Sequence, residues 1–344
     1  MRARRVGVGP CAGTDGGGLG GTGADPTCPA SLAPVRALLV VNPVATSTSF
    51  RTRDVLTAAL EADLKLEVTT TTTRGHAAEL AHQARIDGVD IVVALGGDGT
   101  VNEVVNGLLR DGPRQGIPSL AVVPGGGTNV FARALGLPED PVEATGALLS
   151  AVRAGRSRAI GLGQAGDRWF TFNAGVGWDA AVVARVDRRR HKIPAAHPPS
   201  SGDYVRAAAQ QFFLSGERRR RGLTIYRPGA APLTDVHLAV VSNTAPWTYL
   251  GNRPLLMSPA ASFDTGLDLY ALTRLRTVAT LLEVRRLVTG RVGDTAKQVH
   301  RLHDVASLTL TADRPMAAQV DGEYLGDVQS LALRCVPQAL RVVV

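Results

Sequence analysis

The first half of the chain alternates between short apolar runs and segments whose apolar residues recur at helical spacing. The third run, Ile91-Val92-Val93-Ala94-Leu95, is apolar throughout, as expected of a strand buried on both faces of a sheet. Strands that alternate with helices in this way predict an open parallel sheet with helices. The strands are expected at 37–41, 64–70, 91–95 and 119–123, and the helices at 50–62, 77–85, 101–108, 130–135 and 141–154.

From about residue 158 the pattern changes to short segments in which apolar and polar residues alternate, which predicts antiparallel strands and one helix at 278–288. The expected fold is an α/β N-terminal domain (35–157) followed by a β-rich, mostly antiparallel sandwich domain (158–335). Residues 1–34 are glycine-rich and lack periodicity, so we expect a disordered extension there. The strands of the second domain are expected at 169–173, 223–226, 236–242, 267–272, 307–311, 316–320 and 330–335.

The composition narrows the range of partners. A net charge of +8 favours anionic partners such as nucleotides, acidic lipid surfaces or nucleic acid. Aromatic residues make up only 4% of the chain, which argues against binding single-stranded nucleic acid by base stacking. The three cysteines form no metal-like cluster and no apolar run has transmembrane length, so a cytoplasmic protein is expected.

The turn after the third predicted strand carries the first candidate chemistry. It reads Gly96-Gly97-Asp98-Gly99, and its glycines let the backbone bend sharply and approach a ligand. Thr100 and Glu103 have the spacing of a capping box, which predicts that a helix begins here. A helix N-terminus binds phosphate through its free N–H groups, and Asp98 would stand beside a metal–phosphate complex. The turn matches neither the P-loop nor the G-x-G-x-x-G dinucleotide motif.

The other three strands of the predicted sheet also end in polar or glycine-rich turns. Asn42-Pro43 follows the first strand, Thr71 follows the second, and Gly125-Gly126-Gly127-Thr128-Asn129 follows the fourth. The carboxyl ends of parallel strands meet at one edge of a sheet, where ligands bind. The sequence therefore predicts a phosphate-binding site at this edge.

A second group of motifs lies in the other half of the chain and ends with Asp321-Gly322-Glu323. Together the motifs resemble the diacylglycerol kinase catalytic-domain family, the soluble bacterial lipid kinases related to sphingosine kinases, over about residues 36–344. The Gly-Gly-Asp-Gly turn alone is shared with NAD kinases and phosphofructokinases, whereas its pairing with the late Asp-Gly-Glu is more specific. The resemblance rests on Asn42-Pro43, Thr71 with Gly75-His76-Ala77, Gly96 to Thr100 with Asn102-Glu103, Pro124-Gly125-Gly126, Asn129-x-Phe131-Ala132-Arg133, Asn173-Ala174-Gly175 with Gly177, Phe263-Asp264-x-Gly266-Leu267, and Asp321-Gly322-Glu323.

The resemblance implies an ATP-dependent lipid kinase that transfers the γ-phosphoryl group to a lipid hydroxyl, with diacylglycerol giving phosphatidic acid. It implies ATP and Mg²⁺ as cofactors, a nucleotide-binding first domain and a lipid-binding second domain. It also implies a lipid substrate at the membrane surface, peripheral membrane association and no nucleic acid partner, and it leaves a homodimer open. The last strand, at residues 336–344, is expected to return to the first domain.

The resemblance also assigns the site residues. Asp98, Asp321 and Glu323 are implied as catalytic, with Asp321 as the general base and Asp98 helping to hold Mg²⁺. Arg133 or main-chain N–H groups are expected to share the charge of the phosphates. The residues implied to hold ATP are Asn42, Pro43, Thr71, Gly96, Gly97, Gly99, Thr100, Asn102, Glu103, Gly126, Gly127, Thr128 and Asn129.

The chain departs from the family pattern at two positions. Gly127 stands where the family usually has Thr or Ser, and Thr128 follows it. Thr265 replaces the aspartate that precedes Gly266 in the family's second-domain metal site, which leaves Asp264 and Asp268 as the substitute ligands.

Two other functions remain open at this stage. An NAD kinase would share the glycine turn and the two-domain plan, and a non-catalytic protein would bind lipid or nucleotide without transfer. The basic runs at Arg185–Lys192 and Arg218–Arg221 are either solvated faces or contacts with an anionic membrane surface.

Overall fold

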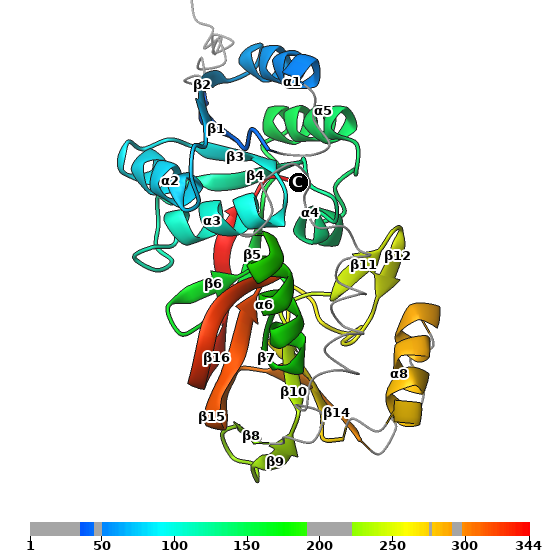
Figure 1. The fold of residues 1–344 in the computed structure, drawn as a ribbon. Coiled ribbons are helices and arrows are strands. Elements are labelled where there is room, and N and C mark those ends of the chain that lie inside the picture. Colours follow the sequence, from blue (N-terminus) through cyan, green and yellow to red (C-terminus); the bar gives the residue numbers. More distant parts are fainter. Residues whose placement is uncertain (1–34, 45–49, 191–221, 275–276, 291–297) are drawn as a thin grey trace, which may run out of the picture. The chain divides into compact units, whose positions relative to one another are not determined.

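Four parallel strands form the centre of the N-terminal half, in the order β4-β3-β1-β2 (Figure 1). The computed structural model describes residues 35–44, 50–190, 222–274, 277–290 and 298–344. The predicted tail (1–34) and the second basic run (Arg218–Arg221) lie outside these ranges. The strands are β1 (Arg36–Val41), β2 (Lys65–Thr70), β3 (Ile91–Gly96) and β4 (Ser119–Pro124), and the helices are α1 (Phe50–Glu61), α2 (His76–Ile86), α3 (Asp98–Leu108), α4 (Val130–Ala134) and α5 (Pro141–Arg153).

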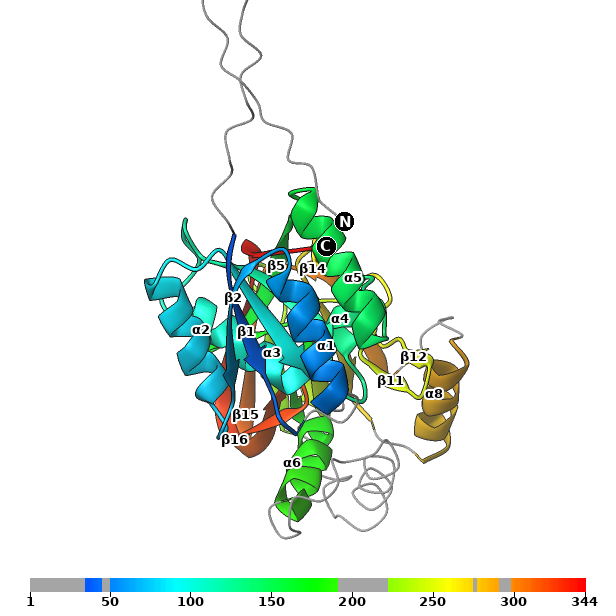
Figure 2. The ribbon, with the colours of Figure 1, turned by 90° about the horizontal axis from the view of Figure 1, so that it is seen from above.

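Both faces of this sheet are covered, which explains why β3 is apolar throughout. Successive side chains of a strand point to opposite faces. Val92 and Ala94 pack in a core with α2 and α3, whereas Val93 and Leu95 pack in a second core with α1 and α5. Figure 2 shows the two pairs of helices on the two sides of the sheet. The predicted α/β class is confirmed.

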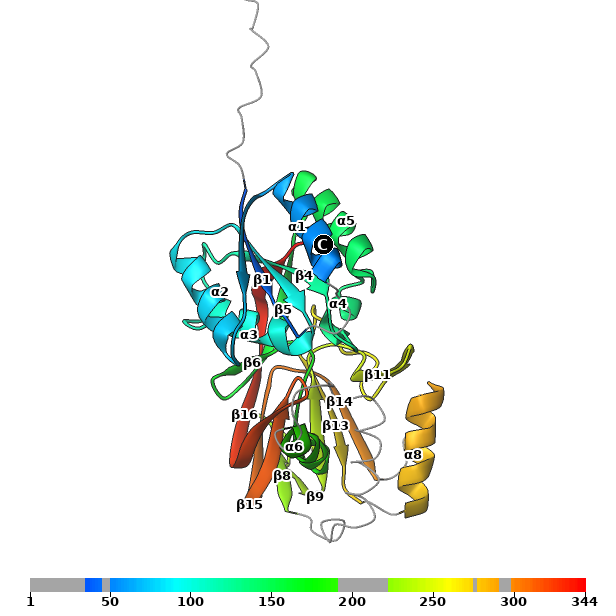
Figure 3. The ribbon, with the colours of Figure 1, turned by 45° about the horizontal axis from the view of Figure 1, so that its top comes forward.

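The C-terminal half is an antiparallel β-sandwich, as predicted, in which β14-β13-β10-β7-β15-β16 are neighbours in one path (Figure 3). Within the described residues, no helix combines the length and apolar character needed to cross a bilayer. The strands are β5 (Arg158–Ala165), β6 (Arg168–Phe170), β7 (Asn173–Gly177), β8 (Leu223–Tyr226), β9 (Leu233–Val236), β10 (Leu238–Ser242), β11 (Thr248–Leu250), β12 (Arg253–Leu255), β13 (Leu267–Leu272), β14 (Val299–Val305), β15 (Ser307–Val320) and β16 (Glu323–Val342), with helices α6 (Trp178–Arg190) and α8 (Thr277–Thr289).

The two halves are joined by a long strand. β16 begins in the antiparallel half, where it pairs with β15, and ends beside the parallel sheet, where Val342 pairs with Leu120 of β4. The sequence analysis predicts two strands here, one at residues 330–335 in the second domain and one at 336–344 that returns to the first. In the structure both ranges belong largely to the single strand β16. Residues 34–344 pack as one compact unit, so the domain boundary at 157/158 stays a prediction.

Candidate active site

The two glycine turns that follow β3 and β4 lie directly against each other. The Gly125 N–H donates to the Gly96 carbonyl at 2.8 Å. A Cβ added at Gly126 would lie 2.6 Å from the Gly97 Cα, closer than any side chain tolerates. Glycine is therefore required here by backbone contact, and the two turns form one wall at the carboxyl edge of the sheet.

Asp98 stabilises this wall from inside. Its Oδ2 accepts from the Val130 N–H at 3.0 Å and its Oδ1 accepts from the Phe131 N–H at 3.1 Å, so the first residue of α3 caps the start of α4. Burial raises the pKa of Asp98 to about 6, although these backbone bonds and a bond from the Thr128 side chain favour its charged form. These three donors use part of the hydrogen-bonding capacity of the Asp98 carboxylate, and its predicted role in holding Mg²⁺ stays a prediction.

The second glycine turn is closed by its own asparagine. The Asn129 side chain accepts from the Gly126 N–H and donates to the Gly126 carbonyl, both at 2.8 Å, while its backbone has a φ of 45°. Gly127 has open space around it. Since Thr128 bonds to Asp98, its hydroxyl has a partner within the protein, and its predicted contact with ATP stays a prediction, as does that of Gly127.

The polar residues at the ends of β1 and β2 line the same edge. The Asn42 amide donates to the Thr100 hydroxyl at 2.9 Å, which joins the end of β1, just before Pro43, to the first turn of α3. The Thr71 N–H donates to the Val41 carbonyl at 2.8 Å, so Thr71 extends the pairing of β2 with β1. Their predicted contacts with ATP stay predictions.

The predicted capping box is wrong. Helix α3 begins at Asp98, with Gly97 as its N-cap and no side-chain cap, so Thr100 already lies inside the helix. The Glu103 carboxylate instead caps α2, accepting from the Gly75 N–H at 2.8 Å and the Ala77 N–H at 3.2 Å. Glu103 thus orients the loop between β2 and α2, and its predicted contact with ATP stays a prediction.

Asp321 is buried and accepts five hydrogen bonds. The Asn102 amide, the Thr171 N–H and the Thr171 hydroxyl donate to its Oδ2 at 2.7–2.8 Å. The N–H groups of Phe172 and Asn173 donate to its Oδ1, both at 3.0 Å. A carboxylate offers about four lone-pair positions. No position is left for a substrate hydroxyl, so the geometry does not support the prediction that Asp321 is the general base.

Asn102 connects α3 to the antiparallel half. Its Nδ2 donates to Asp321 at 2.7 Å and to the Trp169 carbonyl at 3.0 Å. Its Oδ1 accepts from the Arg168 guanidinium at 2.5 and 3.1 Å. Because every polar atom of this buried amide bonds to the protein, Asn102 positions the two halves, and the geometry does not support a direct contact with ATP.

Glu323 is the acidic residue that faces the glycine turn. A Cβ added at Gly99 would lie 3.2 Å from the Glu323 Oε1, so this carboxylate sits against the N-terminus of α3. Arg74 and Arg168 each place a guanidinium nitrogen 3.2 Å from its Oε2. The Glu323 side chain is 23% exposed, which leaves it accessible to a ligand.

Sequence reasoning missed Arg74 and Arg168. Arg74 lies in the loop after β2 and Arg168 begins β6, 155 residues before Glu323. No spacing rule links the three residues. The one available signal was that Arg74 directly precedes the Gly75-His76-Ala77 segment.

The structure does not bring the remaining predicted residues to this site. Asp264 pairs with Arg158 at 2.5 Å on the surface, and Asp268 accepts from His303 at 2.7 Å. Within the described residues, no group of three or more His, Cys, Asp or Glu residues is arranged to hold a metal ion, so the predicted metal role of Asp264 is not supported. Arg133 pairs with Glu139 at 3.0 Å and lies over the Tyr249 ring, and its predicted contact with the phosphates stays a prediction.

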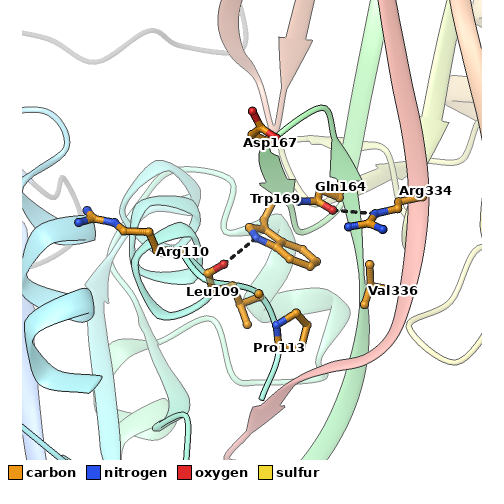
Figure 4. Close-up of a pocket in the computed structure, with 9 residues that line it drawn as sticks. Leu109, Arg110, Pro113, Gln164, Asp167, Trp169, Arg334 and Val336 are labelled. Atoms are coloured by element: carbon orange, nitrogen blue, oxygen red, sulfur yellow. Dashed lines mark hydrogen bonds between the residues drawn. The ribbon is translucent and has the colours of Figure 1, made fainter. Parts of the chain in front are cut away.

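The structure also contains a hollow of about 630 Å³ at the opposite end of α3 (Figure 4). Trp169 lines it and donates from its indole N–H to the Leu109 carbonyl at 3.1 Å. Arg334 lies across from it and donates to the Gln164 side chain at 2.8 Å. Neither glycine turn nor Glu323 lines this hollow, so the candidate active site is separate from it.

Comparison with known proteins gives consistent matches over both halves. Residues 36–165 match the diacylglycerol kinase catalytic domain, and residues 173–344 match the YegS C-terminal NAD kinase beta sandwich-like domain. The chain is 38% identical over 302 residues to a diacylglycerol kinase of Bacillus subtilis (strain 168). This match covers 85% of this chain and 90% of that protein. It is 37% identical to a probable lipid kinase YegS-like of Chromohalobacter salexigens over 131 residues, 38% of this chain and 40% of that protein.

Solved structures agree with this result at the level of the fold. A putative diacylglycerol kinase from Bacillus anthracis str. Sterne superposes with a TM-score of 0.70 at 20% identity, and covers 90% of this chain and 97% of that one. A second structure of a diacylglycerol kinase from the same organism gives a TM-score of 0.66 at 19% identity, with the same coverage.

Proposed function

The chain belongs to the diacylglycerol kinase family of lipid kinases, and we propose that it transfers the γ-phosphoryl group of ATP to the hydroxyl of diacylglycerol, giving phosphatidic acid. Membership of this family makes the chain a lipid kinase, a phosphotransferase that uses ATP. The choice of diacylglycerol rests on the relative that matches over most of both chains, which is named a diacylglycerol kinase.

We place the ATP phosphates on the wall formed by the two glycine turns. The first N–H groups of an α-helix have no partner within the helix and carry partial positive charge, so they attract phosphate. α3 begins at this wall with Asp98, Gly99 and Thr100. The close contact of Gly97 and Gly126 leaves main chain rather than side chains facing the ligand.

Glu323 is the proposed general base. As the lipid oxygen attacks the γ-phosphorus, the hydroxyl proton passes to the Glu323 carboxylate, and the bond from the γ-phosphorus to the bridging oxygen breaks to release ADP. The single observation that carries this proposal is the position of the Glu323 Oε1 against Gly99, which puts a carboxylate beside the proposed phosphate seat. Asp321 and Asn102 hold the strand turn and α3 together without joining in proton transfer.

The two arginines bring the positive charge that the reaction requires. The Arg74 side chain is 57% exposed and the Arg168 side chain 33% exposed, so both are accessible to phosphate oxygens. Guanidinium groups neutralise the charge on a transferring phosphoryl group. Arg168 also bonds to Asn102, which keeps its guanidinium beside Glu323, while Arg74 is the more exposed of the two.

Mg²⁺ enters the proposal only as the companion of the ATP phosphates. Magnesium is usually held by one or two carboxylates together with substrate phosphates, rather than by a cage of protein ligands. Asp98 already accepts backbone hydrogen bonds and Asp264 pairs with Arg158, so we assign neither carboxylate to the ion.

A labelled-phosphate assay tests the proposed function. The full chain would be incubated with γ-labelled ATP, Mg²⁺ and, in separate reactions, a diacylglycerol, a sphingoid base and NAD. We expect labelled phosphatidic acid from the first reaction. Label on NAD alone, or binding of lipid and ATP with no transfer under several divalent ions, would replace the proposal with the NAD kinase or the non-catalytic alternative.

A further inference from the structure

Helix α8 has its apolar and polar faces reversed relative to a helix that packs on a protein core. Val278 is 72% exposed, Leu281 54% and Leu282 49%, whereas Glu283 is only 3% exposed. At 100° per residue, the three apolar residues form one stripe that also contains Arg285. A core-packed helix would place leucines inside and the carboxylate outside. The exposed stripe therefore needs a separate explanation.

Buried polar contacts hold α8 in this orientation. The Glu283 carboxylate accepts from the Tyr270 hydroxyl of β13 at 3.2 Å and from the Arg301 guanidinium of β14 at 3.0 Å. Leu287, one turn further along the same face, is 8% exposed and packs in a core with Tyr270. The acid is therefore the anchor of the helix, and rotating α8 to bury its leucines would separate the buried Glu283 from the half-buried Arg301 that pairs with it.

The exposed stripe carries positive charge and lies beside a second exposed segment. Arg285 lies on the stripe and Arg274 just before the helix, and both are exposed. Glu283 is the one acidic residue among the described residues of α8, and because it is buried it adds no negative charge to the exposed face. The β11–β12 hairpin contacts α8 through β12 (Figures 1 and 3). Leu250 and Arg253 of this hairpin are exposed.

We propose that these residues form a docking surface for an anionic lipid bilayer. The surface, called here the α8 surface, consists of Val278, Leu281, Leu282 and Arg285 of α8 with Leu250 and Arg253 of the β11–β12 hairpin. This proposal rests on the proposed function, because a diacylglycerol acceptor resides in the bilayer and the kinase must reach it there. Leucines beside arginines, with no exposed acid among the described residues of the helix, are typical of helices that lie in an anionic interface.

The α8 surface is linked to the proposed ATP site through the hairpin. The Arg133 guanidinium of α4 lies 3.4 Å from the centre of the Tyr249 ring, next to Leu250. α4 is the helix whose N-terminus Asp98 caps. The hairpin thus connects the α8 surface to the helix that follows the second glycine turn.

Vesicle binding by the full chain tests the proposal without any kinase measurement. The chain would be sedimented with vesicles of phosphatidylcholine alone and of phosphatidylcholine mixed with phosphatidylglycerol, in the absence of ATP. We expect binding to the anionic vesicles, and a fall of about ten-fold or more in the double variant Leu281→Gln, Leu282→Gln, since each leucine contributes burial of apolar surface. Arg285→Glu should weaken binding to anionic vesicles and leave the weak binding to neutral vesicles unchanged.

The matched control replaces two apolar residues of the N-terminal half that are at least as exposed, Val55→Gln with Ile86→Gln, and should bind as the wild type does. Equal binding by the Leu281 and Leu282 variant and the wild type, or no binding by the wild type, would overturn the proposal. So would a wild-type dimer in analytical ultracentrifugation that the leucine variant converts to monomer, because α8 would then be a self-interface.

A second readout separates this proposal from the proposed function. The leucine variant should phosphorylate a water-soluble short-chain diacylglycerol at the wild-type rate, but phosphorylate diacylglycerol in anionic vesicles about ten-fold more slowly. A wild type that phosphorylates neither acceptor refutes the proposed function, while the vesicle-binding comparison still decides the role of the α8 surface.

Discussion

The turn between β15 and β16 contains two carboxylates, one of which stabilises the fold while the other faces the proposed ATP site. Asp321 is buried under five donors, and Glu323 faces the glycine turn. Replacing each by its amide keeps the shape and removes the charge. Asp321→Asn should therefore damage the fold, and Glu323→Gln should damage the chemistry.

The cost of Asp321→Asn follows from its donors. In the better orientation the new amide keeps its oxygen at the Oδ2 position, where three donors converge, and turns its NH₂ group toward the N–H groups of Phe172 and Asn173. Two buried N–H groups then lose their acceptor, at about 1–3 kcal/mol each. Burial raises the pKa of Asp321, so removing its charge offsets part of this loss. The two N–H groups together cost about 2–6 kcal/mol before this offset, so we expect a net loss of about 1–4 kcal/mol from a typical stability of about 5–15 kcal/mol.

Glu323→Gln should leave the free energy of unfolding within about 1 kcal/mol of wild type, because its ion pairs with Arg74 and Arg168 are partly exposed. Loss of a general base typically lowers kcat by about 10²–10⁴-fold. Urea denaturation followed by circular dichroism measures the first quantity. Initial rates with labelled ATP and a short-chain diacylglycerol measure the second.

The two variants test each other. An Asp321→Asn protein that unfolds at the wild-type urea concentration but has lost turnover would show that Asp321 acts in the chemistry, and the structural assignment would be refuted. A Glu323→Gln protein with near-normal kcat would remove Glu323 as the base.

Three further predictions concern the surroundings of this turn. Gly126→Ala should abolish ATP binding, measured by calorimetry, because its Cβ would lie 2.6 Å from backbone of the other glycine turn. Gly146→Ala in α5, where a Cβ meets open space, should bind as wild type, and equal affinities of the two variants would contradict the close contact. Arg168→Met should lower kcat roughly ten-fold by releasing the base carboxylate, and an unchanged kcat would show that Arg74 alone suffices. Burial raises the pKa of Asp179 to about 6 from its ordinary 3.8, so the folded state holds a proton that the unfolded state has released, and this contribution to stability is lost as pH rises through about 6. Relative to Asp179→Asn, the wild type should lose about 2 kcal/mol between pH about 4 and pH about 7.5, measured by urea denaturation, and a difference independent of pH would contradict this.

The local patterns determined the two-part fold and the place of the ligand edge. Runs such as Ile91–Leu95 predict a strand because every position must be apolar when both faces of a sheet are covered. Glycines in the turns predict a close backbone approach because they lack a Cβ, and the packing of Gly97 on Gly126 has this form. Such features depend on neighbours in the sequence, so they can be read without coordinates.

The partner of each polar side chain was decided only by the tertiary structure. The sequence analysis expected Asp98 to act at the ATP phosphates, Glu103 to cap its own helix and Asp321 to act on the substrate. In the structure each carboxylate accepts from backbone or amide groups of another element. Asn102 and Asp321 lie 219 residues apart, and no periodicity connects them. Hydrogen bonds are short-ranged and directional, so whether a carboxylate anchors the fold or faces a ligand depends on which donors the folded chain brings within about 3 Å.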